Sequence, residues 1–244
     1  MGYSAERVAA FCLEKGIECD NAADFDILCE RLLAFNAHTN VTAIKTESGV
    51  CVLHFLDSLY ALAYDLIPRG ASVIDIGCGA GFPGLPLAMV RKDIHVSFVD
   101  STAKKLKFTS EISDLFGLGA DVFPARAEEL LAGGHREKYD IAVSRAVASL
   151  PVLCELCLPY VKVGGAFIAY KSKKECDTTN PMSELSLAKK AIPALGGKVE
   201  VIHDANLTED DGRIDEHALI VIRKVKATNP IYPRRYAAIV KKPL

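Results

Sequence analysis

The sequence of 244 residues contains no apolar run that approaches the roughly 20 residues of a membrane-spanning helix. Its first twenty residues carry several acidic side chains and no long apolar core, so we expect no secretory signal peptide. Glu6 occupies the position at which an N-myristoylation motif has Ser or Thr. Together these absences predict a cytoplasmic protein that does not associate with membranes.

The chain also lacks a second close pair of cysteines. Of its eight cysteines, only Cys154 and Cys157 lie close together in the sequence, within an apolar segment of helical character. A structural zinc site needs a further pair of ligands, so we expect buried thiols and no metal. Eight cysteines without a signal peptide are typical of a protein from a reducing compartment.

Net charge is small, at −2, but the charges are unevenly distributed. Residues 1–70 contain ten acidic and five basic side chains, whereas residues 221–244 contain seven basic side chains and none that is acidic. Basic terminal segments often bind polyanions, and a solvated terminus without a partner is the alternative. We expect phosphate contacts, with no effect on cofactor binding, from Arg223, Lys224, Lys226, Arg234, Arg235, Lys241 and Lys242.

The hydrophobic pattern divides the chain into three parts. Helical spacing of apolar residues occurs at 4–15, 22–36 and 49–66, with Gly16 ending the first helix and Asn21 capping the second. We therefore expect a helical cap over residues 1–66, an α/β domain over residues 67–226 and a basic tail over residues 227–244.

From residue 71 short apolar runs alternate with helical segments. Strands are expected at 73–76, 96–100, 121–124, 139–144, 166–170, 199–203 and 218–224. Helices are expected between them, for example at 103–115 and 150–161. This order predicts a Rossmann-like α/β fold with a parallel sheet, and the polar loop 204–217 predicts that the last strand is antiparallel.

The most informative segment follows the first expected strand and contains four glycines. Glycines at this point let the backbone turn sharply and approach a ligand closely. Gly79, Gly81 and Gly84 match a dinucleotide fingerprint, which is a weak signal alone. The pattern Asp75-x-Gly77-x-Gly79-x-Gly81 fits S-adenosylmethionine better, because that ligand has no pyrophosphate and its cationic sulfonium and amine suit a carboxylate. This glycine pattern, together with the antiparallel last strand, predicts a class I S-adenosylmethionine-dependent methyltransferase fold.

Polar residues at the ends of the next strands extend this expected site. Asp100 ends the second strand, where a carboxylate accepts hydrogen bonds from ribose hydroxyls, and helix capping is the alternative. Ala127 and Glu128 follow the third strand, in a loop that either covers adenine or simply starts a helix. Arg145 ends the fourth strand, where a guanidinium can stack on a base or bind a phosphate. We expect Arg145 to affect turnover more than folding.

Five segments carry a more specific signal. They read NVTAI at 40–44, HFLDSL at 54–59, DIGCGAGFPGLP at 75–86, DSTAKK at 100–105 and SRAVASL at 144–150. With the YPRR…KKPL ending, they resemble the bacterial glucose-inhibited division protein B family, the 16S ribosomal RNA (guanine-527-N7)-methyltransferases. The resemblance covers nearly the whole chain. It implies that a monomer transfers a methyl group from S-adenosylmethionine to 16S ribosomal RNA, free or in a small-subunit particle.

The glycine pattern and the resemblance together define the candidate site residues. The expected cofactor-binding residues are Asp75, Gly77, Gly79, Gly81, Phe82, Asp100, Ser101, Ala127, Glu128 and Arg145. The candidate catalytic residues are Asn40, His54, Asp57, Arg145 and Lys171. The chain departs from the family at Phe82, where a bulky aliphatic residue is usual, and at His217, where Arg is frequent.

The implied chemistry needs little acid–base machinery. Guanine N7 is a lone-pair nucleophile without a proton, so catalysis consists of placing N7 in line with the methyl group. Lys171, Lys173 and Lys174 follow the fifth strand and are expected to meet RNA phosphates. Two other functions stay open at this point: hydride transfer with a nicotinamide dinucleotide, and RNA binding without catalysis.

Overall fold

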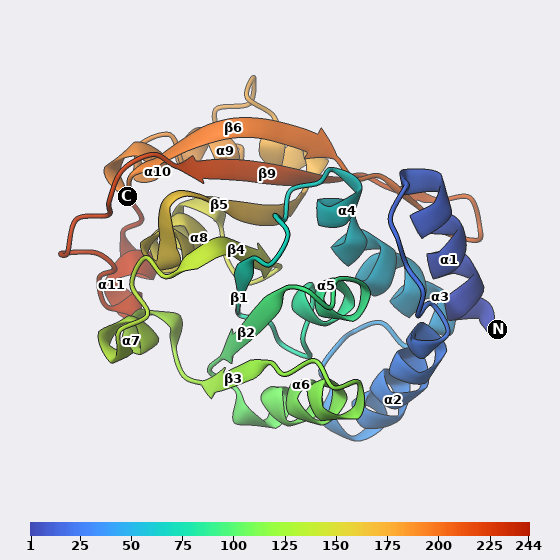
Figure 1. The fold of residues 1–244 in the computed structure, drawn as a ribbon. Helices are drawn as coiled ribbons and strands as arrows, with labels where there is room; N and C mark the ends of the chain where they lie inside the picture. Colours follow the sequence, from blue (N-terminus) through green and yellow to red (C-terminus); the bar gives the residue numbers. More distant parts are fainter.

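A seven-stranded sheet with helices on both faces forms the centre of the computed structural model, which describes residues 1–244 (Figure 1). The spatial order of the strands is β3-β2-β1-β4-β5-β9-β6. The strands are β1 (Ser72–Ile76), β2 (His95–Asp100), β3 (Asp121–Pro124), β4 (Tyr139–Arg145), β5 (Val161–Ser172), β6 (Gly197–Asp204) and β9 (His217–Lys224). Strands β1 to β5 are parallel, and β9 lies antiparallel between β5 and β6, which confirms the predicted fold class.

Eleven α-helices surround the sheet. They are α1 (Tyr3–Lys15), α2 (Asp24–Thr39), α3 (Glu47–Val50), α4 (Asp57–Ala63), α5 (Gly84–Val90), α6 (Ala103–Leu115), α7 (Ala127–Leu130), α8 (Leu150–Cys157), α9 (Glu184–Leu187), α10 (Ala191–Ala194) and α11 (Tyr236–Lys241). The connection between β6 and β9 contains a small hairpin of β7 (Leu207–Thr208) and β8 (Ile214–Asp215). No helix combines the length and the apolar character that crossing a membrane requires.

The alternation of side chains along β1 explains why both faces of the sheet are covered. Val73 contributes to a core formed with α1, α2, α4, α5 and α6, whereas Ile74 and Ile76 contribute to a second core under α8. Cys154 and Cys157 are fully buried free thiols in this second core, as predicted. Because both faces are apolar, polar side chains gather at the carboxyl ends of the strands.

Two predicted helices differ in detail from the structure. The helix expected at 150–161 ends at Cys157, because a 3₁₀ turn (Leu158–Tyr160) follows and Val161 already begins β5. The helix expected at 49–66 begins at Glu47 with α3 and continues through a π-helical segment (Cys51–Leu56) into α4. Hydrophobic periodicity does not distinguish these helix types over so few residues.

Asn21 does not cap the second helix, contrary to the sequence prediction. The cap position of α2 is Ala23, and the Asn21 side chain donates a hydrogen bond to the Met89 carbonyl oxygen at 2.9 Å. Asn21 therefore links the turn before α2 to the end of α5. The other expected boundary is confirmed, since Gly16 ends α1 with a left-handed φ of 68°.

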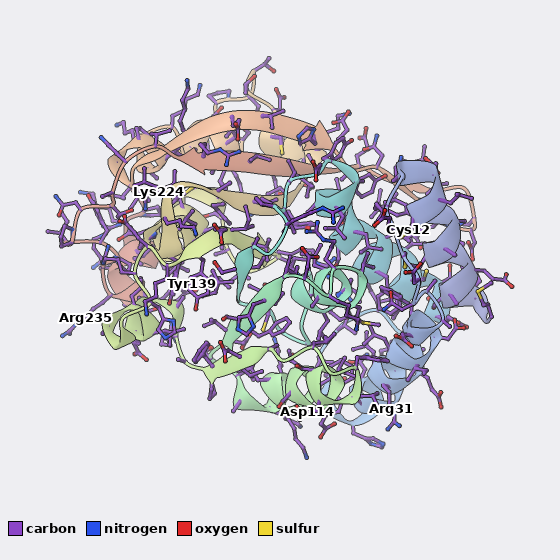
Figure 2. The ribbon with its side chains drawn as sticks, in the orientation of Figure 1. Cys12, Arg31, Asp114, Tyr139, Lys224 and Arg235 are labelled. Atoms are coloured by element: carbon purple, nitrogen blue, oxygen red, sulfur yellow. The ribbon has the colours of Figure 1, made fainter.

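The C-terminal tail folds back onto the second core. Arg234 pairs with the fully buried Glu155 of α8, with Nη2 and Oε2 2.6 Å apart, and Ile239 of α11 is buried. Lys224 is also buried and pairs with Glu137. The prediction of free phosphate-binding cations is therefore wrong for Arg234 and Lys224. Arg223 is also paired, with Glu200 at 2.7 Å. Of the seven cations, the exposed ones are Lys226, Arg235, Lys241 and Lys242, and Figure 2 shows Arg235 at the outer edge beside α7.

Candidate cofactor and nucleobase site

The glycine turn after β1 depends on left-handed backbone at Gly77, Gly79 and Gly81, with φ values of 71°, 58° and 91°. A Cβ atom at Gly77 would lie 2.4 Å from a methyl carbon of Val147, and one at Gly81 would lie 2.4 Å from Leu85. A Cβ atom at Gly79 would meet nothing within 4 Å. Gly77 and Gly81 are thus needed for packing, whereas Gly79 faces open space that a ligand can approach.

Asp75 lies beneath this turn and is fully buried. Its Oδ2 atom accepts a hydrogen bond from the Gly84 backbone N–H at 2.8 Å, and its Oδ1 atom has no partner. Burial raises the pKa of Asp75 to about 7 despite the Gly84 hydrogen bond. Asp75 lines neither of the cavities described below, so its direct role is to hold the beginning of α5.

A first cavity of about 290 Å³ opens at the carboxyl ends of β1, β2, β3 and β4. Its lining residues come from these strand ends, from α8 and from the C-terminal tail: Ile76, Gly77, Val99, Asp100, Ser101, Thr102, Lys105, Ala125, Arg126, Ala127, Glu128, Ala146, Val147, Leu156 and Tyr236. Five expected cofactor residues meet here, namely Gly77, Asp100, Ser101, Ala127 and Glu128. No sequence signal pointed to Tyr236, which belongs to the tail.

Asp100 connects the cavity to the glycine turn. Its Oδ2 atom accepts from the Gly79 N–H at 3.0 Å, and its Oδ1 atom accepts from the Thr102 N–H at 2.7 Å. A carboxylate has about four acceptor positions, so both oxygens can still accept from hydroxyl groups. Asp100 therefore fits the role of ribose acceptor. It does not cap α6, whose cap position is Thr102, and instead binds the turn that precedes this helix.

The start of α7 forms another wall of this cavity. Ala127 and Glu128 are its first residues, and the N–H groups of a first helical turn have no partner within the helix. The Glu128 carboxylate is held by Arg126, with Nε and Oε1 2.9 Å apart. The cavity thus offers N–H donors and carboxylate acceptors side by side, which suits the ring nitrogens and amino group of adenine.

These residues fit S-adenosylmethionine and do not fit a dinucleotide. A dinucleotide fingerprint directs helix N–H groups at a pyrophosphate. Here the Gly84 N–H at the beginning of α5 is already bonded to Asp75 Oδ2, so this donor is not available to a phosphate. Acceptors for an adenosine are present, and an open approach exists at Gly79.

A second cavity, of about 590 Å³, lies beside the first. Ala146 lines both cavities and has a left-handed φ of 55°, which is rare outside glycine. The second cavity is lined by Ile44, Leu53, His54, Asp57, Arg145, Ala146, Tyr170, Lys171, Ser172, Lys174, Glu175, Arg213, Asp215 and His217. Four of the five candidate catalytic residues are among them: His54, Asp57, Arg145 and Lys171.

Arg145 is the centre of a buried polar network in this cavity. Its Nη1 atom donates to Asp57 Oδ2 at 2.7 Å, and its Nη2 atom donates to His54 Nδ1 at 2.9 Å. His217 Nδ1 donates to the other Asp57 oxygen at 2.9 Å. Since His54 Nδ1 accepts, its ring proton lies on Nε2, which donates to Thr42 Oγ1 at 2.8 Å.

The pKa values of this network follow from burial and from neighbouring charges. Burial lowers the pKa of His54 to about 3, and the Arg145 charge adds to this effect, so His54 is neutral. The hydrogen bond to Asp57 raises the pKa of His217. Burial alone would raise the pKa of Asp57, but the His217 hydrogen bond and the Arg145 charge hold it below its usual value. Asp57 is therefore an ionised carboxylate between the Arg145 guanidinium and the His217 ring.

Phe82 provides a flat surface next to this network. The His54 ring stacks on Phe82 with centroids 4.7 Å apart and an interplanar angle of 14°. The Arg145 guanidinium carbon lies 5.6 Å from the same ring. Both residues were expected to bind cofactor. Arg145 lines the second cavity, whereas Phe82 is buried, lines neither cavity and contacts the site through the His54 ring.

Lys171 and Asn40 do not have the surroundings expected for candidate catalytic residues. Lys171 is buried, donates to the Ala148 carbonyl oxygen and pairs with Glu184 at 2.6 Å, so its charge is not available to RNA phosphates. Lys173 pairs with Asp204, whereas Lys174 is exposed and lines the second cavity. Asn40 ends α2 with a left-handed φ of 49° and lines neither cavity.

The fold and the polar groups that line the first cavity define a class I S-adenosylmethionine-dependent methyltransferase. A solved S-adenosylmethionine-dependent methyltransferase of Methanosarcina mazei has the same fold, with a TM-score of 0.52 and 16% identity over 68% of this chain and 98% of that one. The family described as rRNA small subunit methyltransferase G matches residues 21–205. The chain belongs to this family.

Relatives of this family are similar over most of their length. A ribosomal RNA small subunit methyltransferase G from Alkaliphilus metalliredigens is 40% identical over 237 residues, which cover 96% of this chain and 95% of the relative. One from Clostridium novyi is 38% identical over 212 residues, which cover 86% of this chain and 84% of the relative. The likeness therefore includes both cavities, and it removes hydride transfer as an alternative.

Proposed function

We propose that this protein transfers a methyl group from S-adenosylmethionine to N7 of a guanine in 16S ribosomal RNA of the small subunit, at the position that gives the family its 527 designation. Family membership supports the class of reaction and substrate. An RNA substrate from the ribosome supports a location in the cytoplasm.

The observation that carries this proposal is the junction of the two cavities at Ala146. One cavity has acceptors for an adenosine, and the other is lined by the His54 ring and by cationic groups such as Arg145. A methyl group can pass between two ligands only if they meet in line, and Ala146 marks that meeting point. Its small side chain leaves the passage open.

When bound, S-adenosylmethionine supplies a methyl group on a positively charged sulfur. Guanine N7 carries a lone pair and no proton, so the chain needs no general base, and its residues act by position. The His54 ring lines the second cavity and is held flat against the buried Phe82 ring, so His54 offers a surface for a purine. Arg145 offers N–H donors to acceptor atoms of the base or of a phosphate.

Tritiated S-adenosylmethionine and small subunits that lack the modification test this proposal. We expect labelled 7-methylguanosine after digestion of the 16S RNA to nucleosides. Label on another nucleoside or on protein would overturn the proposed reaction. Calorimetry with S-adenosylhomocysteine and with NAD checks the cofactor separately, and binding of NAD alone would contradict it.

A further inference from the structure

The first cavity has one wall that comes from a distant part of the chain. All its lining residues lie between Ile76 and Leu156 except Tyr236, the first residue of α11. The Arg126 guanidinium carbon lies 4.4 Å from the centroid of the Tyr236 ring. Arg126 also pairs with Glu128, so Tyr236 is tied to the loop that offers groups to adenine.

The tail is held in this place by a buried ion pair. Arg234 donates through Nε and Nη2 to both oxygens of Glu155, at 2.9 and 2.6 Å, and its backbone N–H donates to Oε1 at 2.8 Å. Glu155 is fully buried, so a shift of the tail would leave a carboxylate without its cation. Ile239 adds apolar burial on the same core. These contacts fix Tyr236 at the cavity.

We propose that residues 232–244 complete the cofactor site, with Tyr236 packing against the adenosine part of S-adenosylmethionine and the Arg234–Glu155 pair acting as its positioning contact. This inference rests on the proposed function. It replaces the sequence-based expectation that the tail has no effect on cofactor binding. The exposed cations Arg235, Lys241 and Lys242 lie on the same segment, which places the tail's RNA contacts next to the cofactor.

Aromatic contact with a base contributes enough to be measured. Removing such a contact weakens binding by about fivefold or more. The Tyr236→Ala substitution should therefore raise the dissociation constant of S-adenosylhomocysteine by about fivefold or more. Tyr236→Phe keeps the ring and should bind like the parent. Val240→Ala is the matched control, because Val240 is exposed on the same helix and lines no described cavity.

The experiment is calorimetric titration of S-adenosylhomocysteine into the full-length parent and the three variants, with thermal unfolding to confirm that each is folded. Replacing both Arg234 and Glu155 by Gln removes the positioning pair without leaving an unpaired charge, and should weaken binding as Tyr236→Ala does. Equal affinity of the parent and Tyr236→Ala would overturn this inference while the proposed function stands. No binding to the parent would overturn both.

Discussion

Replacement of Arg145 by Met removes a cation from the centre of the second cavity. Only 12% of the Arg145 side chain and 1% of the Asp57 side chain are exposed, and the guanidinium also donates to the Leu53 carbonyl oxygen at 3.0 Å. The sequence suggested that Arg145 serves turnover more than folding. The structure gives it a large structural role as well, because its removal leaves Asp57 buried with His217 as its remaining partner.

The size of the effect can be worked from these contacts. Breaking a buried ion pair by removing one partner costs about 3–5 kcal/mol. Since His217 still donates to Asp57, we expect the lower end, about 3 kcal/mol. For a chain of this size each kcal/mol lowers the melting temperature by about 2–4 °C, so Arg145→Met should melt roughly 6–12 °C below the parent.

A second substitution separates the charge effect from packing. In Arg145→Met with Asp57→Asn no buried carboxylate is left unpaired, so the double variant should lose less stability than Arg145→Met alone. Calorimetry and urea unfolding at neutral pH measure the free energy of unfolding of the single and the double variant. A loss below 1 kcal/mol for Arg145→Met, or a double variant less stable than the single one, would refute the reasoning.

Three further outcomes follow from the site. Gly79→Ala adds a methyl group that meets no protein atom but strains the left-handed backbone by about 1–2 kcal/mol. We therefore expect cooperative unfolding to persist at a somewhat lower midpoint and S-adenosylhomocysteine binding to be lost in calorimetry; retained affinity would mean that no ligand approaches Gly79. Burial raises the pKa of Asp75 from 3.8 to about 7, so the native state keeps a proton that the unfolded chain releases, and the parent loses stability as pH rises through this window. The stability of Asp75→Asn relative to the parent should therefore rise by up to about 4 kcal/mol between pH 4 and pH 7 in urea unfolding, and a flat difference would contradict the assigned burial. Lys241→Gln with Lys242→Gln should weaken RNA binding and flatten its dependence on salt in filter-binding titrations, whereas an unchanged salt slope would show that these cations do not contact phosphate.

The sheet and the cofactor side of the site could be predicted from the sequence because both are encoded locally. A strand buried on both faces has an apolar run, and the residue that ends the run lies at the carboxyl edge of the sheet. The sequence located Asp100 and Arg145 at the carboxyl edge of the sheet in this way. The glycine turn indicated that a ligand binds at this same edge. Adjacent residues in the sequence carry this information, so no long-range contact had to be guessed.

The choice of partners could not be predicted, because it depends on contacts between distant segments. Asp57 pairs with His217, 160 positions away, and no local pattern connects them. Lys171 was expected to follow the fifth strand, but it lies within β5 near the end of the strand, and its charge is neutralised by Glu184. Tyr236 lines the cofactor cavity because the neighbouring Arg234 forms an ion pair with the buried Glu155 of α8. The number of basic residues in the tail does not reveal which of them are buried when the tail packs against the second core.

The central claim is methylation of guanine N7 at one position of 16S ribosomal RNA. The most direct test treats small subunits with the protein and S-adenosylmethionine, then cleaves the extracted RNA at 7-methylguanosine with borohydride and aniline. The account predicts one new cleavage, at guanine 527, that depends on both the protein and S-adenosylmethionine. Cleavage elsewhere, or methyl transfer without any cleavage, would contradict it.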